Sequence, residues 1–177
     1  MRPASSATVV LFFLACAACN GNVAPPPPYH STGNAGGPFV PKDGAALFDE
    51  LGPNSLELIM SDYVGACSMA INSSHVNAGV LSLSAQGGMD PVTTGTFTID
   101  GSTYGATLVR WDGACNRTAA DVASGGTITL TAVSRSEVKG TFDLKFPDGE
   151  LKGDFDAPGC VPPLTDAGTV CVGGDGG

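Results

Sequence analysis

The stretch of sequence that decides the fold runs from Gly125 to Ala157 and reads GGTITLTAVSRSEVKGTFDLKFPDGELKGDFDA. Over residues 138–146, apolar residues and one glycine occupy every second position, and polar residues occupy the positions between them. A period of two places the first set on one face of a β-strand and the second set in water. The same alternation returns over residues 151–157, after an Asp148-Gly149 dipeptide that tolerates the positive φ values of a tight hairpin turn. The stretch therefore predicts a β-hairpin with one buried face.

Other parts of the chain carry the same pattern. Ile128, Leu130 and Ala132 alternate with threonines, which predicts a third strand that buries these three side chains. Further alternating segments lie at residues 56–60, 81–85, 94–99 and 104–111, and residues 45–51 are compatible with a short helix or a strand. Turn residues recur at the spacing typical of sandwiches and barrels. We therefore predict an all-β fold, a single antiparallel β-sandwich or partly open β-barrel of about seven to eight strands, braced by disulfides.

A glycine precedes a phenylalanine by two positions in both arms of the hairpin, at Gly140 and at Gly153. One interpretation is that the backbone comes close to a ligand at these positions. The other is a bulge or bend where a twisted sheet curls over its core. We favour the bulge or bend, because both glycines belong to the face that carries the large apolar residues.

The N-terminus has the features of an export signal. Arg2 precedes an apolar run that is too short to span a bilayer as a permanent helix, and small residues follow it. The end of this segment resembles a bacterial lipobox, in which a cysteine is lipidated and becomes the new N-terminus. We favour Cys19 as the lipidated residue, because polar residues follow it directly, and Cys16 is the alternative. The resemblance implies a lipid anchor in the outer membrane; plain secretion or a periplasmic location is the alternative.

Composition divides the remaining chain into three parts. Residues 19–43 contain four consecutive prolines and a glycine-rich run, which predicts a spacer behind the lipid. Residues 44–160 hold the alternating segments and form the predicted all-β domain. Residues 161–177 end in a glycine-rich sequence that predicts a flexible tail. Residues 1–18 are the predicted signal peptide.

The charge of the protein limits its partners. The full chain has a formal charge of −9, and removal of residues 1–18 takes away only Arg2, which leaves 7 basic and 17 acidic residues and a charge of −10. Such a surface argues against nucleic acid as a partner, because phosphates require basic side chains. It also argues against charge-driven binding to anionic lipid head groups. The predicted membrane contact is therefore the N-terminal lipid alone, and no protein or glycan partner is specified.

Four cysteines remain after the predicted signal peptide, namely Cys67, Cys115, Cys160 and Cys171. An even number of cysteines in an exported chain predicts two disulfides, and three pairings are possible. We favour Cys67–Cys115 and Cys160–Cys171, because both members of each pair fall in predicted loops at strand ends. A zinc site is disfavoured, since the domain has no Cys-x-x-Cys motif and the cysteines are widely spaced.

A search for catalytic chemistry finds no motif. The chain lacks a Gly-x-Ser-x-Gly elbow, a P-loop, a dinucleotide fingerprint and a His-Glu-x-x-His sequence. Its two histidines are His30, in the predicted spacer, and His75, in a predicted loop. Carboxylates recur on the wet face of the hairpin, but lysines are interleaved with them, and cross-strand ion pairs explain the pattern better than a calcium or acid–base site. We therefore predict no enzyme activity, no catalytic residue, no metal and no cofactor.

Trp111 and Tyr104 are the two large amphipathic aromatic residues in one predicted strand. They are candidates for a stacking platform that binds a sugar or a peptide, although a place in the core is the commoner fate of such residues. An apolar cleft beside Trp111 would favour ligand binding. An interior filled by phenylalanines would count against it.

The lipobox-like start, the Pro/Gly spacer and three short segments together resemble the uncharacterised lipoproteins of myxobacteria and their relatives. The segments are Ser124-Gly-Gly-Thr-Ile-Thr-Leu, Val138-Lys-Gly-Thr-Phe-Asp-Leu and Gly153-Asp-Phe-Asp-Ala-Pro-Gly-Cys160. The resemblance covers roughly residues 45–160. It implies an envelope location and an all-β domain, and it carries over no activity. We expect a non-enzymatic cell-envelope lipoprotein with a structural or binding role; the alternative is a module that binds a sugar, lipid or peptide on the sheet face or barrel mouth.

Overall fold

The structure is a computed structural model, and it describes residues 29–48, 54–67, 74–87, 90–161 and 171–172. These residues form β-strands and no helix. The strands are β1 (His30–Ala35), β2 (Asp43–Phe48), β3 (Ser55–Ser61), β4 (Ser74–His75), β5 (Gly79–Gln86), β6 (Gly95–Thr98), β7 (Tyr104–Trp111), β8 (Arg117–Val122), β9 (Gly125–Ser134), β10 (Glu137–Phe146), β11 (Gly149–Cys160) and β12 (Cys171–Val172).

Ten of these strands form one curled sheet in the order β6-β9-β10-β11-β2-β3-β5-β7-β8, with β1 paired to β11 beside this path. Neighbours are antiparallel except at one joint, where Gly159 and Cys160 at the end of β11 pair in parallel with Ala46 and Leu47 of β2. Within the described residues, β6 and β8 at the two ends of the order are not hydrogen-bonded to each other. The sheet is therefore an open half-barrel, which confirms the all-β prediction in its partly open form.

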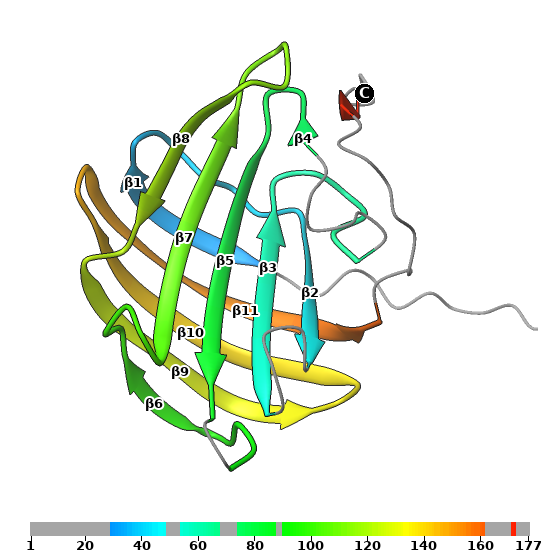
Figure 1. The fold of residues 1–177 in the computed structure, drawn as a ribbon, viewed down its shortest axis with the longest axis vertical. Coiled ribbons are helices and arrows are strands. Elements are labelled where there is room, and N and C mark those ends of the chain that lie inside the picture. Colours follow the sequence, from blue (N-terminus) through cyan, green and yellow to red (C-terminus); the bar gives the residue numbers. More distant parts are fainter. Residues whose placement is uncertain (1–28, 49–53, 68–73, 88–89, 162–170, 173–177) are drawn as a thin grey trace, which may run out of the picture.

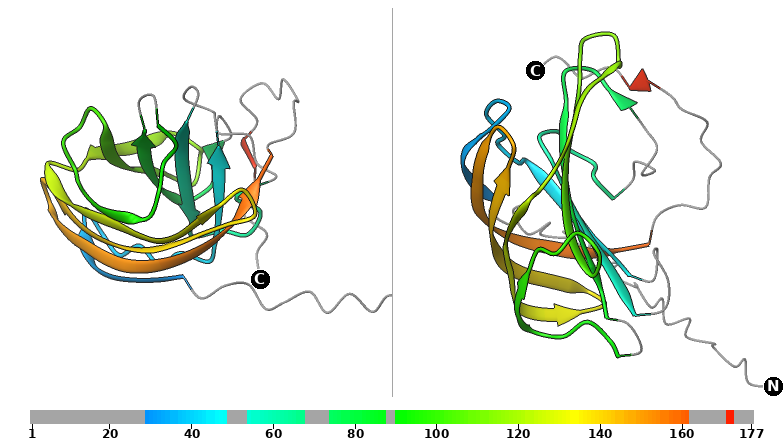
Figure 2. Two further views of the ribbon diagram at one scale, coloured as in Figure 1. Left: turned by 90° about the horizontal axis from the view of Figure 1, so that it is seen from below. Right: turned by 60° about the vertical axis from the view of Figure 1, so that its left-hand side comes forward.

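The joint divides the sheet into two layers that cross. Figure 1 shows β2, β3, β5 and β7 running at a steep angle in front of β9, β10 and β11. From below, the β9–β10–β11 layer curves around the other strands like a bowl (Figure 2). The inner faces of both layers share one core, as in orthogonally packed sheets. Its fully buried side chains include Leu56, Met60, Leu81, Leu108, Leu144 and Leu151.

The predicted hairpin is confirmed. The two arms pair antiparallel from Glu137↔Pro158 to Phe146↔Gly149, so the turn lies at the predicted Asp148-Gly149. All five apolar or glycine positions of residues 138–146 are buried, while the residues between them are half-buried or exposed. The alternation in the sequence therefore identifies the core face of β10 without error.

The repeated glycines let the two arms pack their phenylalanines. In the register, Gly140 lies opposite Phe155, and Phe142 lies opposite Gly153. A Cβ atom placed on Gly153 would lie 2.6 Å from Cζ of Phe142, and one placed on Gly140 would lie 2.8 Å from Cζ of Phe155. Each ring therefore occupies the space above the glycine of the neighbouring strand, an arrangement known as aromatic rescue. A register shift between Lys139 and Gly140 also places a bulge here, as predicted.

The same bulge corrects one predicted core position. Lys139 pairs with Ala132, but Gly140 pairs with Leu130, so Thr131 is an extra residue in β9. An extra residue moves every following side chain to the opposite face. Ile128 and Leu130 are buried as predicted, whereas the prediction for Ala132 is wrong, and Val133 packs against the core in its place.

Strands β2 and β3 are covered on both faces. Ala46, Leu56 and Met60 belong to the main core, while Ala45, Leu47 and Ile59 face a second apolar cluster on the other side. Residues 45–48, which the sequence left open between helix and strand, are therefore strand, and their near-continuous apolar run reflects burial on two faces.

The sheet has more strands than the seven to eight predicted. Two strands are polar, and the alternation of apolar and polar residues does not identify them. β1 reads HSTGNA and lies within the predicted spacer of residues 19–43, yet it pairs with β11 from His30↔Asp154 to Ala35↔Gly149. β8 reads RTAADV, which does not alternate, and it pairs with β7. Backbone hydrogen bonds to a neighbouring strand, rather than apolar side chains, define both. The signal peptide, the four prolines and most of the predicted tail lie outside the described residues.

Candidate functional site

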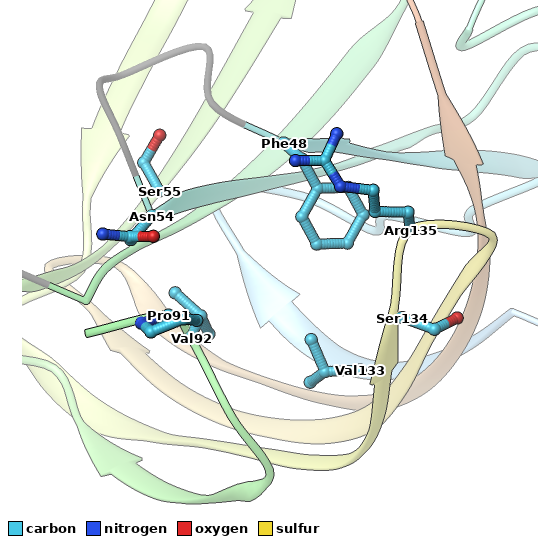
Figure 3. Close-up of a pocket in the computed structure, with 8 residues that line it drawn as sticks. All are labelled: Phe48, Asn54, Ser55, Pro91, Val92, Val133, Ser134 and Arg135. Carbon is cyan, nitrogen blue, oxygen red and sulfur yellow. The ribbon is translucent and has the colours of Figure 1, made fainter.

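The candidate site is a pocket of about 300 Å³ at one end of the half-barrel, between the ends of β2 and β3 and the turn after β9 (Figure 3). Its walls come from four places: the end of β2, the start of β3, the segment before β6, and the end of β9 with the turn that follows. The lining residues are Phe48, Asn54, Ser55, Pro91, Val92, Val133, Ser134 and Arg135.

The floor of the pocket is apolar. Phe48, Val92 and Val133 are partly buried and pack against the main core, so the pocket continues the core to the surface. Val133 points inward because of the bulge at Thr131. Strict alternation along residues 128–133 assigns Val133 to the outer face of the sheet. The residue types in this segment do not reveal the bulge, so the sequence does not predict that Val133 lines a pocket.

The rim is polar and is held in place by a tight turn. The Ser134 hydroxyl accepts a hydrogen bond from the Glu137 amide at 3.1 Å and lies 3.1 Å from the Glu137 carbonyl oxygen, to which it can donate. The amide of Gly159 donates to the Ser136 carbonyl at 2.8 Å, and a Cβ on Gly159 would overlap the Arg135 carbonyl oxygen. The backbone that carries Arg135 is therefore fixed against the end of β11, with the arginine at the pocket mouth.

Trp111 and Tyr104 do not form a platform. They stand at opposite ends of β7, and an odd separation along a strand places them on opposite faces. Tyr104 stacks on Phe97 with ring centroids 4.6 Å apart and packs against the core. Neither residue lines the pocket of Figure 3.

Four phenylalanines contribute to the interior of the half-barrel. Phe142, Phe146 and Phe155 are buried in the main core, and Phe97 packs against it. These are the phenylalanines expected to count against an internal ligand chamber.

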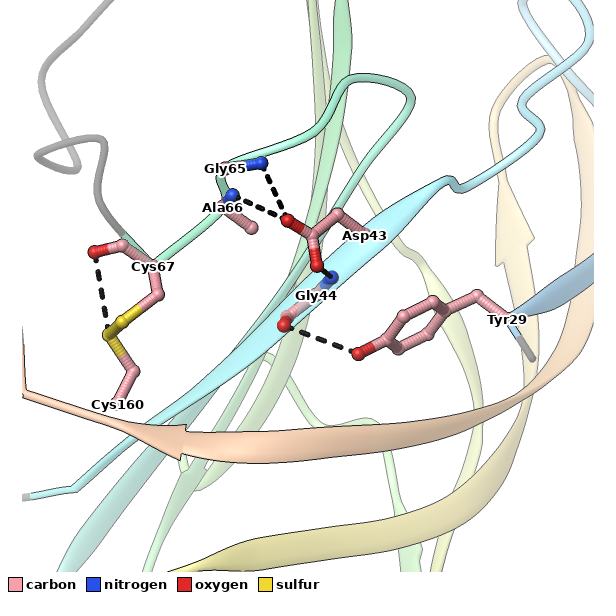
Figure 4. The surroundings of a disulfide bond; sticks show 7 residues. All are labelled: Tyr29, Asp43, Gly44, Gly65, Ala66, Cys67 and Cys160. Atoms are coloured by element: carbon pink, nitrogen blue, oxygen red, sulfur yellow. Dashed lines mark hydrogen bonds between the residues drawn. A yellow bond between two sulfur atoms is a disulfide. The ribbon is translucent and has the colours of Figure 1, made fainter. Parts of the chain in front are cut away.

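The disulfide pairing differs from the predicted one. Cys67 is bonded to Cys160, with a Cα–Cα distance of 5.7 Å, so Cys67–Cys115 and Cys160–Cys171 are both wrong (Figure 4). Cys115 also takes part in a disulfide. The reason lies in the joint between the layers: parallel pairing of β11 with β2 brings Cys160 next to residues 62–67, which follow β3. Proximity of loops along the sequence does not reveal this contact.

Asp43 fastens the same loop over β2. Its carboxylate accepts hydrogen bonds from the amides of Gly65 at 2.6 Å, Ala66 at 3.0 Å and Gly44 at 2.8 Å (Figure 4). Ala66 then covers the second apolar cluster together with Cys160. The carboxylate and the disulfide thus hold one loop at neighbouring points, which is a structural role.

The carboxylates of the hairpin form ion pairs with lysines of the neighbouring strand, as predicted. Lys152 lies opposite Asp143 with Nζ 2.8 Å from the carboxylate, and Lys139 lies opposite Asp156 at the same distance. These hydrogen bonds raise the pKa of both lysines. His30 lies 3.2 Å from Asp154, in β1 rather than in an unstructured spacer. The solvent-exposed face of the hairpin therefore carries ion pairs between neighbouring strands.

Two further acidic residues are explained by turns. Asp100 accepts hydrogen bonds from the amides of Tyr104, Ser102 and Thr103, which lower its pKa to about 2. Asp112 accepts in the same way from Asn116 and Ala114, which also lowers its pKa. Both carboxylates stay ionised and close β-turns.

A buried polar cluster lies beside β4. His75 is only 3% exposed and stacks on Tyr63 with ring centroids 3.8 Å apart. Burial lowers the pKa of His75, and the nearby Asp62 carboxylate opposes that shift. Burial raises the pKa of Tyr63 to about 12 and also raises the pKa of Asp62, whose carboxylate accepts the Gly79 amide at 2.9 Å. The imidazole is therefore kept neutral inside the domain.

Within the described ranges, no group of three or more His, Cys, Asp or Glu side chains is arranged to hold a metal ion. The same ranges contain no helix of the length and apolarity needed to cross a membrane. Comparison of the chain with family models, with curated proteins and with solved structures gave no match.

Proposed function

We propose that this chain is a non-enzymatic lipoprotein of the cell envelope, attached to the outer membrane through lipid on Cys19, with a structural or binding role for its β-domain. The Cys67–Cys160 disulfide carries the proposal, because such bonds persist in compartments outside the reducing cytosol. An exported chain with a lipobox-like cysteine is consistent with that bond.

The side-chain chemistry supports a role without catalysis. Asp143, Asp100 and Asp43 are engaged in a cross-strand ion pair, in a turn and in fastening a loop, respectively. The buried His75 stacks on Tyr63 in a site separate from the pocket. Among the described residues that line the pocket, no carboxylate, histidine or cysteine is present to serve as base or nucleophile.

A second candidate function is ligand binding at the mouth of the half-barrel. The pocket observed there supports it, since small-molecule sites are concave and mostly apolar with a few polar groups. The binding role and the envelope location are compatible.

Membrane fractionation tests the anchor. The full chain, its Cys19→Ser variant and its Cys16→Ser variant are expressed in a Gram-negative host, and the membrane and soluble fractions are compared. We expect Cys19→Ser to move the protein to the soluble fraction and Cys16→Ser to leave it with the membrane. The reverse result would assign the lipid to Cys16, and membrane retention of a variant lacking both cysteines would refute a lipid anchor.

A further inference from the structure

His75 is held inside the domain with a ring nitrogen that has no hydrogen-bond partner. The residue is 3% exposed, and among the described residues no polar group bonds to its Nε2. In a neutral imidazole one nitrogen is an acceptor, whereas both nitrogens of the protonated ring are donors. Protonation would therefore place a charge and an unpaired N–H donor in a buried site, and both disfavour the protonated ring there.

Tyr63 and Asp62 are titratable side chains that face the imidazole, and both belong to the segment after β3. Tyr63 stacks on the ring, and burial raises the pKa of Tyr63 to about 12, so its phenol stays neutral where histidine titrates. The Asp62 carboxylate favours the protonated imidazole, but burial outweighs it and lowers the pKa of His75. Further charges act on Tyr63 or Asp62, namely Lys42, Asp43 and Arg110.

The two sides of this stack are held with different firmness. On the Tyr63 side, the Ser61 hydroxyl donates to the Tyr63 carbonyl at 2.8 Å. The Asp62 amide donates to the Gly79 carbonyl at 3.2 Å, and the Gly79 amide donates to the Asp62 carboxylate at 2.9 Å. On the His75 side, β4 has two residues and pairs, within the described part of the chain, with the two residues of β12. A two-stranded sheet is marginally stable, so β4 is the side that yields.

We propose that β4 is a pH-sensitive switch, in which protonation of His75 opens the pairing of β4 with β12 and moves the imidazole from Tyr63 into water. At neutral pH the uncharged ring favours the closed form. In mildly acidic solution water solvates the imidazolium, and the open form exposes the face of the Tyr63 ring that the imidazole covers. The opening depends neither on the lipid anchor nor on the pocket at the end of the half-barrel.

Linkage gives the sign and the size of the effect. The closed form binds the proton less readily than the open form, because burial lowers the pKa of His75 in the closed form. The ratio of open to closed molecules therefore rises as the pH falls below about 6.5, by up to about tenfold per pH unit, until the pKa of the closed form is reached.

Hydrogen exchange tests the switch on the oxidised full chain with Cys16→Ser and Cys19→Ser, so that no lipid is attached. After correction for the intrinsic exchange rate, protection of residues 74–77 should fall about tenfold between pH 7.0 and pH 5.0. Low concentrations of urea should accelerate exchange of residues 138–146 in β10 and leave that of residues 74–77 unchanged, because a local opening exposes little surface.

His75→Phe keeps an aromatic ring against Tyr63 and removes the titrating group. Protection of residues 74–77 should then change by less than about twofold over the same pH range. His30→Phe is the matched control, because His30 is exposed beside Asp154 on β1, and it should behave like the unsubstituted protein. Circular dichroism identifies variants that keep the fold.

Titration of the unsubstituted protein followed by NMR gives a second reading, which does not depend on the folding of a variant. The His75 ring should titrate below about pH 6.5, the value of an unperturbed histidine. A midpoint at or above that value would overturn the proposal, as would the same pH dependence of protection in His75→Phe. Exchange of residues 74–77 that follows residues 138–146 in urea would show that β4 opens only when the whole domain unfolds, and would refute a local switch.

Discussion

Replacement of Gly140 by alanine should destabilise the domain more than its one-carbon size suggests. The new Cβ would overlap the Thr129 carbonyl oxygen of β9 and lie 2.8 Å from the Phe155 ring of β11. The first obstacle is backbone within a hydrogen-bonded pair, so it can yield only if β9 and β10 separate at the bulge. Overpacking of a core typically costs about 1–3 kcal/mol, and we expect the upper end, about 3 kcal/mol, because neither neighbour is the free end of a flexible chain.

The matched control for this variant is Gly125→Ala, at the start of β9, where a Cβ meets no atom within 4 Å. It should leave the free energy of unfolding unchanged or raise it slightly, since alanine restricts the unfolded chain. The measurement is urea unfolding of the oxidised protein, followed by circular dichroism, and the midpoint and slope are compared. If Gly140→Ala and Gly125→Ala differ by less than about 1 kcal/mol, the close packing of Phe155 over Gly140 does not explain the repeated glycine.

Three further perturbations have defined outcomes. Replacing Cys67 and Cys160 together by serine should lower the free energy of unfolding by about 4–5 kcal/mol, from the loop entropy of a 93-residue separation; peptide mapping that finds Cys67 linked to Cys115 would contradict the observed pair. Because His75 titrates at a lower pH in the folded domain than in the unfolded chain, its contribution to stability is present above about pH 6.5 and is lost as the pH falls toward its folded pKa. His75→Phe should therefore reduce the loss of stability between neutral and mildly acidic pH, and an unchanged profile would argue against a buried neutral imidazole. Asp43→Asn weakens the charge-assisted hydrogen bonds to the loop before Cys67, and should lower the free energy of unfolding by about 1–2 kcal/mol. Hydrogen exchange at the amides of residues 65 and 66 should accelerate. Unchanged exchange would show that the disulfide alone holds the loop.

The sequence by itself determined most of the segments that become strands and, for most of these, which face is buried. The hairpin of residues 137–160 is the clearest case, because a one-sided sheet requires a period of two and the Asp148-Gly149 turn sets its register. The ion pairs of its exposed face followed from the same pattern, since residues that alternate with the core must lie together in water. These features depend on interactions between neighbours in the chain or in adjacent strands.

The tertiary structure decided what depends on contacts between distant segments. β1 has little apolar side chain to bury and exists because β11 offers it backbone hydrogen bonds. The disulfide partner of Cys67 was fixed by the parallel joint between β11 and β2, a contact that spans most of the domain. The pocket depended on the bulge at Thr131, which turns Val133 inward, and on the meeting of β2, β3, β9 and the segment before β6, which lie far apart in the sequence. Alternation indicates the buried face of a strand only while its register is regular, so it cannot show where a bulge changes that face or which distant segments meet.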